Sequence, residues 1–241
     1  MTISLLSRLN PILEAVRSRP RQVEFVLFDA GRRDRRISEL KKACREAGVS
    51  VRHGERAALD RLARGHQGAV SRVAVREWLP PEAALEGPRG SRLLFVLDEV
   101  QDPHNLGAVL RVAEGVGARV VVPERGSAPL SDAVAKSSAG AVERVAVIRV
   151  GNLRRAIDQL KNEGFRVVGL DPSGELLYRV DLTGDLALVL GAEGKGMRRL
   201  VREGCDVLAR LPMAGEVASL NVSTAAAAAG YEAVRQRSFR A

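Results

Sequence analysis

Three short segments of the chain combine glycine or alanine with polar side chains whose types suit chemistry on a bound ligand. In chain order, the polar residues are Asn105, Arg111, Glu193, Ser219 and Asn221. Glycine and alanine let backbones approach closely, and polar side chains at the mouth of such a region suit contacts with a small molecule. The pattern therefore predicts a ligand site at the ends of strands, built from amide, carboxylate, hydroxyl and guanidinium groups.

Each of these polar residues also has an ordinary structural explanation. Asn105 suits a helix cap, and Glu193 suits a turn. Ser219 and Asn221 suit the cap of the alanine-rich helix around residues 225–229. Their joint occurrence in this order, each near the end of an expected strand, favours a functional site.

Glycine-rich loops raise two nucleotide-binding alternatives, and the sequence argues against both. The stretch GAEGKGM lacks the order of a phosphate-binding loop, because Lys195 precedes Gly196 and Met197 stands where a hydroxyl is required. Gly115 and Gly117 follow an expected helix, whereas a dinucleotide-binding turn must follow a strand. The spacings typical of metal ligands or of a nucleophile elbow are absent, so no metal is expected.

Apolar periodicity predicts the elements that position these residues. The expected strands of the second region are 93–97, 119–122, 145–150, 166–170, 186–190 and 207–211. One expected helix begins near residue 104 or 105, and two more cover 130–139 and 153–163. This alternation predicts an α/β fold with a mostly parallel sheet covered by helices, in which ligands bind beyond the carboxyl ends of the strands.

The first part of the chain predicts a separate, smaller α/β domain over residues 1–78. Its expected helices are 9–17, 37–47 and 56–63, and its expected strands are 23–28, 49–51 and 69–75. Residues 79–91 contain several proline and glycine residues and predict a stiff interdomain linker. A second domain is expected over residues 92–241.

The composition favours an anionic partner. The 241 residues carry a formal net charge of +9, and nucleic acid is a better match for that charge than a membrane. The densest basic cluster is Arg32, Arg33, Arg35 and Arg36. These four side chains are candidates for RNA phosphate contacts, with a merely solvated surface as the alternative.

Targeting and redox signals favour a cytoplasmic protein. No apolar run is long enough for a membrane helix, and the N-terminal segment lacks the cleavage pattern of a signal peptide. Cys44 and Cys205 lack the paired spacing of a zinc or disulfide framework and fit a reducing compartment.

Together, the three polar segments resemble the SpoU/TrmH family of RNA ribose 2′-O-methyltransferases, over residues 93–237. The segments NPILEAVR near the start and HQG before residue 69 resemble the family's RNA-binding extension. The arrangement is most similar to the branch that methylates a guanosine in the peptidyl-transferase region of bacterial 23S ribosomal RNA.

The resemblance implies a trefoil knot of the SPOUT type in the second domain, with S-adenosylmethionine held in the knot, and an obligate homodimer through that domain. It assigns catalysis to Asn105, Arg111, Glu193, Ser219 and Asn221. It assigns cofactor binding to Gly169, Leu170, Gly191, Leu211, Met213 and Leu220. In this interpretation, the glycine at 191 lets the adenine lie against bare backbone.

Methyl transfer to a ribose hydroxyl requires alignment of the oxygen with the methyl group and removal of the hydroxyl proton. We expect Arg111 to grip the target phosphate and to stabilise developing alkoxide charge. A role as general base is the alternative, and it is disfavoured because a guanidinium is nearly always protonated. Residues six apart do not share a helix face, so we expect Asn105 to act from the opening turn of its helix.

Three other functions remain open. They are a transfer-RNA methyltransferase of the same family, a resistance methyltransferase acting on another rRNA loop, and a non-catalytic RNA-binding or ribosome-assembly factor. The separate basic N-terminal domain favours ribosomal RNA over transfer RNA. An inactive relative is expected to lose Arg111 or Asn221, and both are present.

Overall fold

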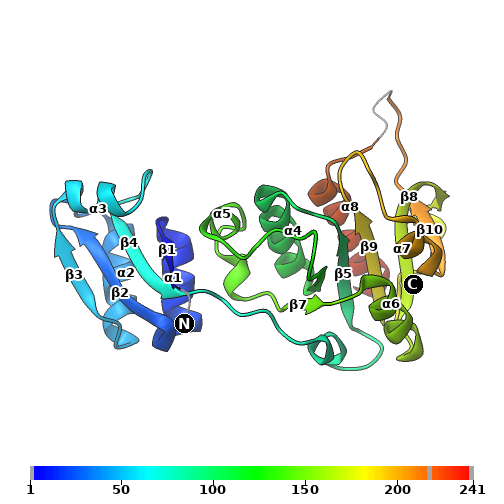
Figure 1. The fold of residues 1–241 in the computed structure, drawn as a ribbon, viewed down its shortest axis with the longest axis horizontal. Coiled ribbons are helices and arrows are strands. Elements are labelled where there is room, and N and C mark those ends of the chain that lie inside the picture. Colours follow the sequence, from blue (N-terminus) through cyan, green and yellow to red (C-terminus); the bar gives the residue numbers. More distant parts are fainter. Residues whose placement is uncertain (1–2, 216–218, 239–241) are drawn as a thin grey trace. The chain divides into compact units, whose positions relative to one another are not determined.

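The computed structural model describes residues 3–215 and 219–238, and the chain divides into two compact units (Figure 1). The first unit comprises Met1–Glu77 and Pro129–Arg144, and the second comprises Trp78–Ala128 and Val145–Ala241. The segment 129–144 thus groups with the first unit, although it follows the predicted linker in sequence. The domain boundaries at 78 and 92 stay a prediction.

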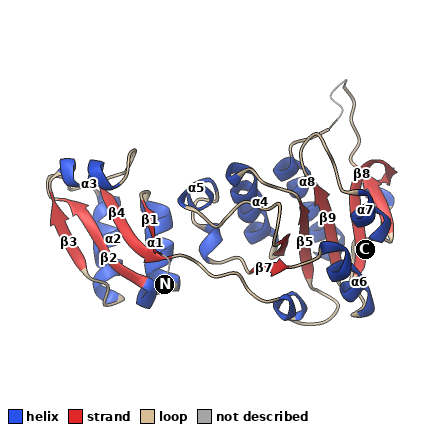
Figure 2. Ribbon diagram, viewed as in Figure 1, coloured by secondary structure: helices blue, strands red, loops and turns tan. Residues whose placement is uncertain are grey.

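The first unit is built on a four-stranded sheet with the order β1-β4-β2-β3 (Figure 2). Its strands are β1 (Ile3–Leu6), β2 (Val23–Asp29), β3 (Val51–Gly54) and β4 (Ala69–Ala74). Its α-helices are α1 (Leu9–Ser18), α2 (Arg35–Glu46), α3 (Arg56–Leu62) and α5 (Asp132–Ser137). Strand β4 runs antiparallel to β1 and β2, whereas β2 and β3 are parallel. The predicted α/β character of residues 1–78 is confirmed.

The second unit contains a six-stranded, wholly parallel sheet with the order β10-β8-β9-β5-β6-β7. Its strands are β5 (Leu93–Asp98), β6 (Arg119–Pro123), β7 (Val147–Val150), β8 (Arg166–Leu176), β9 (Leu186–Gly191) and β10 (Val207–Arg210). Its α-helices are α4 (Pro103–Val116), α6 (Leu153–Asn162), α7 (Arg199–Gly204) and α8 (Val222–Ser238). The predicted parallel α/β sheet is confirmed, while the knot stays a prediction.

Local sequence explains how these layers pack. Every residue of β5 is buried, as expected for a parallel strand covered on both faces. Helix α8 presents small residues to α4 and to the sheet, and a Cβ on Gly230 would lie 2.8 Å from Cζ of Phe95. Glycine and alanine therefore allow α8 to lie closer to the sheet than larger side chains would permit.

Several element boundaries differ from the sequence-based expectation. Strand β1 and helix α7 were not predicted, because each is too short to show a clear periodicity. Strand β8 continues past residue 170, and its pairing with β10 shifts between Leu208 and Ala209. Helix α5 is shorter than the predicted 130–139, since Ala139 has φ of 52° and Gly140 has φ of 93°.

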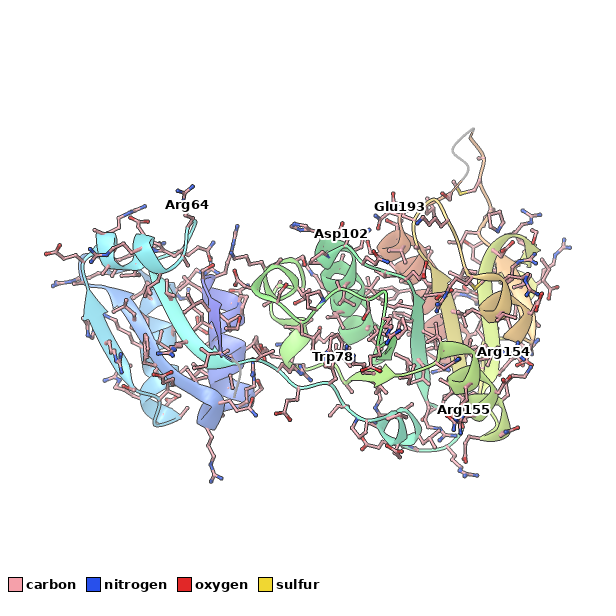
Figure 3. All side chains as sticks on the ribbon, in the orientation of Figure 1. Arg64, Trp78, Asp102, Arg154, Arg155 and Glu193 are labelled. Atoms are coloured by element: carbon pink, nitrogen blue, oxygen red, sulfur yellow. The ribbon has the colours of Figure 1, made fainter. Side chains whose placement is uncertain are left out.

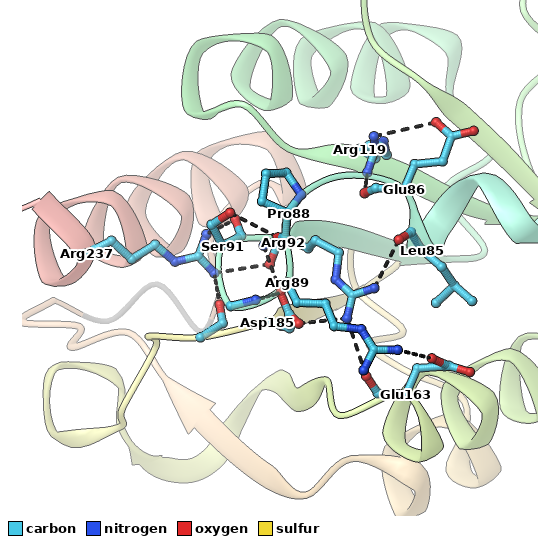
Figure 4. Close-up of polar contacts among 12 residues, drawn as sticks. Leu85, Glu86, Pro88, Arg89, Ser91, Arg92, Arg119, Glu163, Asp185 and Arg237 are labelled. Carbon is cyan, nitrogen blue, oxygen red and sulfur yellow. Dashed lines mark hydrogen bonds and ion pairs between the residues drawn. The ribbon is translucent and has the colours of Figure 1, made fainter.

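The predicted linker packs on the second unit along most of its length. Leu79 pairs with Ile148 beside β7, and a short 3₁₀ helix (Pro81–Leu85) buries Ala83 and Ala84. At its end, Arg92 forms an ion pair of 2.7 Å with Asp185, and the two side chains are 3 % and 9 % exposed (Figure 4). Residues 79–91 are therefore part of the second unit's fold as well as a connection.

The same network fastens the last turns of α8. The Arg237 guanidinium donates to the backbone oxygens of Ser91 at 3.0 Å and Gly184 at 2.8 Å (Figure 4). Burial by itself raises the pKa of Asp185, but hydrogen bonds from the Arg92 side chain and from the Gly90 and Arg92 backbone lower that pKa to about 2. The folded state therefore favours the ionised carboxylate.

We predict that Asp185→Asn lowers the free energy of unfolding by about 2 kcal/mol at pH 7, because the native carboxylate has a depressed pKa. The stabilisation is complete above the ordinary pKa of 3.8 and is lost as the pH falls towards 2. Urea unfolding of both proteins across this range should show the difference shrinking. Asp158→Asn is the control, because Asp158 is half exposed in an i,i+4 pair with Arg154. An equal loss in the two variants would contradict the prediction.

Candidate active site

Asn105, Glu193 and Asn221 meet in one hydrogen-bonded cluster, although they belong to three separate segments. The Asn221 amide Nδ2 donates to Asn105 Oδ1 at 2.9 Å and to Glu193 Oε2 at 3.1 Å. The Asn105 amide Nδ2 also donates to Glu193 Oε2, at 3.4 Å. Glu193 (labelled in Figure 3) is the carboxylate on which both amides converge. We call these three residues the polar cluster.

Asn105 enters the polar cluster from the first turn of α4. The N-cap of this helix is Asp102, whose Oδ1 accepts a hydrogen bond of 2.8 Å from the backbone N–H of His104. Pro103 occupies the first helical position, where a missing N–H has no cost. Asn105 is therefore not the cap, and its amide is available for the contacts with Glu193 and Asn221.

The oxygen and the nitrogen of the Asn221 side-chain amide make different contacts. Its Oδ1 accepts hydrogen bonds from Ser223 N at 2.9 Å and Ser223 Oγ at 2.7 Å, immediately before α8 begins at Val222. Its Nδ2 points to the polar cluster. The contact with Ser223 supports the helix-cap interpretation, and the role of Asn221 as a site residue stays a prediction.

A cavity of about 400 Å³ lies beside the polar cluster, at the carboxyl ends of β9 and β10 and next to the middle of β8. Its wall includes Glu193 and Ser219 from the predicted catalytic set. It also includes Leu170, Gly191, Leu211, Met213 and Leu220 from the predicted cofactor set. Apolar side chains interrupted by a few polar groups are typical of sites for small organic ligands.

Gly169, the remaining predicted cofactor residue, does not line this cavity. It lies inside β8, where a Cβ would be 2.7 Å from Cys205 Sγ and 2.9 Å from Met197 Cε. The absence of a side chain there allows α7 and its flanking residues to pack on the sheet.

Gly191 needs to be glycine for a reason that the sequence did not reveal. A Cβ at this position would overlap the backbone of Gly196 and Met197, because the loop after β9 folds back over it. The loop is closed by a hydrogen bond of 2.9 Å from Gly196 N to Ala192 O. The protein's own backbone, rather than an adenine ring, therefore fills the space beside the Gly191 Cα.

Arg111 stands apart from the polar cluster. It lies on α4 with an exposed side chain, and within the part of the chain that the structure describes, no hydrogen bond or ion pair joins it to the cluster. At 100° per residue, six residues place it about 240° around the helix from Asn105. Its catalytic role stays a prediction, as does that of Ser219. Residues 216–218, which precede Ser219, lie outside the described residues.

The basic cluster of the first unit is only partly available for RNA. Arg32 Nε donates to Asp34 Oδ2 at 2.6 Å, and Arg36 donates to Asn10 Oδ1 at 2.7 Å. Arg33 and Arg35 are exposed at the start of α2. Their role as RNA contacts stays a prediction.

Arg64 was not among the predicted RNA-binding residues, although it adds positive charge near this cluster. It is exposed and lies on the loop before β4 (Figure 3). That loop lies next to the loop after β2, because Asp29 N donates to Gly68 O at 3.0 Å. Sequence spacing alone gave no signal that the two loops are neighbours.

The described residues provide no cluster of three or more His, Cys, Asp or Glu side chains that could hold a metal. Nor does any helix in residues 3–215 or 219–238 combine the length and apolar character needed to cross a membrane.

The second unit thus has a cavity at the carboxyl edge of its parallel sheet, and the first is a separate α/β unit with exposed arginines. The chain belongs to the SpoU rRNA Methylase family, which matches residues 92–231. Residues 9–78 match the family described as RNA 2′-O ribose methyltransferase substrate binding.

The similar proteins share both units. The 23S rRNA (guanosine-2′-O-)-methyltransferase RlmB of Ralstonia nicotianae is 44% identical over 97% of this chain and 96% of its own length. The protein of the same description from Pseudomonas syringae pv. tomato is 44% identical, over 93% of this chain and 92% of its own. The crystal structure of the SpoU methyltransferase AviRb from Streptomyces viridochromogenes in complex with AdoMet is 26% identical, with a TM-score of 0.80 over 97% of this chain and 90% of that one.

We predict that Gly191→Ala destabilises the second unit by about 2 kcal/mol, because the new methyl group overlaps backbone that cannot move independently. Gly151→Ala is the matched control, since a Cβ there meets nothing within 4 Å. Thermal unfolding of the two variants measures the difference. We expect Gly191→Ala to unfold at a clearly lower temperature than Gly151→Ala. A Gly191→Ala protein as stable as the control would show that the loop does not fold as described.

Proposed function

We propose that this chain transfers the methyl group of S-adenosylmethionine to a ribose 2′-hydroxyl in RNA, most specifically a guanosine of 23S ribosomal RNA. The observation that carries the proposal is the polar cluster beside the cavity, which unites all three polar segments. The substrate follows from relatives at 44% identity that span both units and act on a 23S rRNA guanosine.

The cavity fits the cofactor in its chemistry. Leu170, Leu211, Met213 and Leu220 offer apolar surface for an adenine ring, and the turn at Gly191 exposes backbone groups. When bound, S-adenosylmethionine supplies an electrophilic methyl group on a sulfonium. The chain's own task is to hold the ribose oxygen in line with that methyl group and to exclude other geometries.

The polar cluster suits the positioning part of this task. Glu193 accepts hydrogen bonds from two amides on the same oxygen, Oε2, so its carboxylate is held in one orientation. Ser219 adds a hydroxyl to the neighbouring wall. We assign to these residues the orientation of the target nucleotide, and to Arg111 the stabilisation of negative charge on the ribose oxygen.

The position of Arg111 supports a homodimer as the working form. Asn105 contacts the polar cluster from one side of α4, and Arg111 lies on a different side with its guanidinium exposed. A second copy of the chain, with its cavity facing this exposed side of α4, would receive Arg111. We propose that each complete site combines the cavity of one copy with Arg111 of the other.

The first unit is proposed to hold the RNA. Arg33 before α2, Arg35 at its first position and Arg64 on the loop before β4 are exposed, and among the described residues no side-chain hydrogen bond or ion pair fixes them. Phosphate contacts of this kind position a nucleic acid without reading its sequence. A cytoplasmic location is proposed on the ground that ribosomal RNA is the substrate.

The direct test of the function is incubation of the purified protein with labelled S-adenosylmethionine and either 23S rRNA or transfer RNA. We predict 2′-O-methylguanosine in the 23S rRNA alone, identified by nucleoside mass spectrometry. Arg111→Ala should lower the rate at least about a hundredfold while the cofactor dissociation constant, from calorimetry, stays within about threefold. Arg155→Ala, which removes an exposed arginine of α6, is the control. Label only in transfer RNA would refute the substrate assignment.

Mixing two inactive variants tests the shared site. Arg111→Ala and Asn221→Ser each remove one half of a site, and serine preserves the helix cap before α8. After the subunits exchange, half of the dimers carry one of each variant, and each of these has one complete site. We therefore predict recovery of about a quarter of the wild-type activity. Recovery of none would place Arg111 in the site of its own chain.

A further inference from the structure

The loop after β9 meets Asp98 at both ends, through the strand pairing of Gly191 at one end and through the buried Asp98 carboxylate at the other. Asp98, the last residue of β5, is 0% exposed and pairs in register with Gly191, where the loop begins. Its carboxylate accepts hydrogen bonds of 2.8 Å from the backbone N and from Nε of Arg198, where the loop ends. A third nitrogen of Arg198, Nη2, lies 2.7 Å from the same carboxylate. The segment between Gly191 and Arg198 is called the cofactor loop below.

Because the Asp98 carboxylate is buried, it depends on its hydrogen bonds with Arg198. A carboxylate removed from water needs hydrogen bonds on both oxygens, and Arg198 supplies them: its backbone N–H binds Oδ2, and its guanidinium binds Oδ1. The Arg198 side chain is itself 47% exposed, so it reaches inward from the surface to meet Asp98. The end of the cofactor loop is therefore held at a defined place against β5.

The same pair also reaches the segment that leads to α4. Glu99, directly after Asp98, has φ of 58°, a conformation that residues with side chains rarely adopt. Arg198 Nη1 lies 3.8 Å from Glu99 Oε1. The chain then continues to Asp102 and Asn105. The arginine at the end of the cofactor loop therefore also lies close to the segment that leads to the polar cluster.

We propose that Asp98 and Arg198 are positioning residues, which hold the cofactor loop in the form that binds S-adenosylmethionine and that sets Glu193 against Asn105. Neither residue lines the cavity, so the effect passes through the cofactor loop rather than through contact with the ligand. This inference rests on the proposed assignment of the cavity to S-adenosylmethionine.

An ordinary buried ion pair is the competing explanation, and the two explanations differ in a measurable way. Replacing both partners of a buried pair with apolar residues often preserves stability, whereas removing one partner leaves an uncompensated charge. The double variant Asp98→Val with Arg198→Met therefore restores stability relative to Arg198→Met alone. It does not restore the anchor of the cofactor loop.

The experiment measures S-adenosylmethionine binding by calorimetry, well below the melting temperature of each variant. We expect Arg198→Met to raise the dissociation constant about tenfold or more, and the double variant to keep that weakened affinity despite its recovered melting temperature. Arg199→Met is the matched control, because that neighbouring side chain is 77% exposed and pairs only with Glu203 among the described residues. Its affinity should equal that of the wild type.

The proposal is overturned if the double variant binds S-adenosylmethionine as the wild type does, or if Arg198→Met loses only stability. Leu211→Glu, which places a charge in the cavity wall, separates this failure from a failure of the site assignment. Normal binding by Leu211→Glu would reject the cavity as the cofactor site. Weak binding by Leu211→Glu with normal binding by Arg198→Met would reject the positioning role alone.

Discussion

The parallel pairing of β5 with β9 is the interaction on which the candidate site depends. These strands are far apart in sequence, yet their register places Asp98 opposite Gly191. Parallel strands end at the same edge of a sheet, so the segment that starts α4 and the loop after β9 emerge side by side. The contact between Asn105 and Glu193 depends on this register, and a slip of one residue would separate the two side chains.

The sequence predicted those features that arise from local patterns. Continuous apolar runs revealed the buried strands, and the glycine-rich and alanine-rich segments pointed to the edge of the sheet where the cavity lies. Apart from the site residues that the family resemblance grouped, side-chain pairs between segments distant in sequence were not predicted. Asp98 looks like any polar residue at a strand end, and Arg198 looks like one of many charged surface residues. Their pairing exists only because β5 and β9 are neighbours.

The same limit applies to the caps and glycines. Asp102 and Asn105 are both good capping residues, and only the helix start at Pro103 decides between them. Gly191 was assigned to ligand contact, whereas its missing side chain accommodates the returning backbone of Gly196 and Met197. A glycine in a sequence shows that space is needed, but it does not show what fills the space.

The arginine content also has a different meaning once the contacts are known. Arg92 and Arg237 bind carboxylate and backbone oxygens inside the second unit, and Arg19 forms a bidentate pair with the buried Glu143 inside the first. These guanidiniums hold the fold together and are not free to meet phosphate groups. The net charge of +9 therefore overstates the surface that is available to RNA.

The predicted site residues differ in whether they also have a structural role. Asn221 both caps α8 and contacts the polar cluster, so its loss is expected to affect folding as well as the proposed chemistry. Within the described residues, Arg111 has no hydrogen bond or ion pair with the polar cluster and lies exposed on its helix, so the fold does not depend on its guanidinium. Arg111 is exposed at the predicted catalytic position and has no internal structural role in the described residues, which is what the proposed interaction with a second copy requires. That inference joins the proposed dimer to the proposed chemistry, because the same guanidinium serves both.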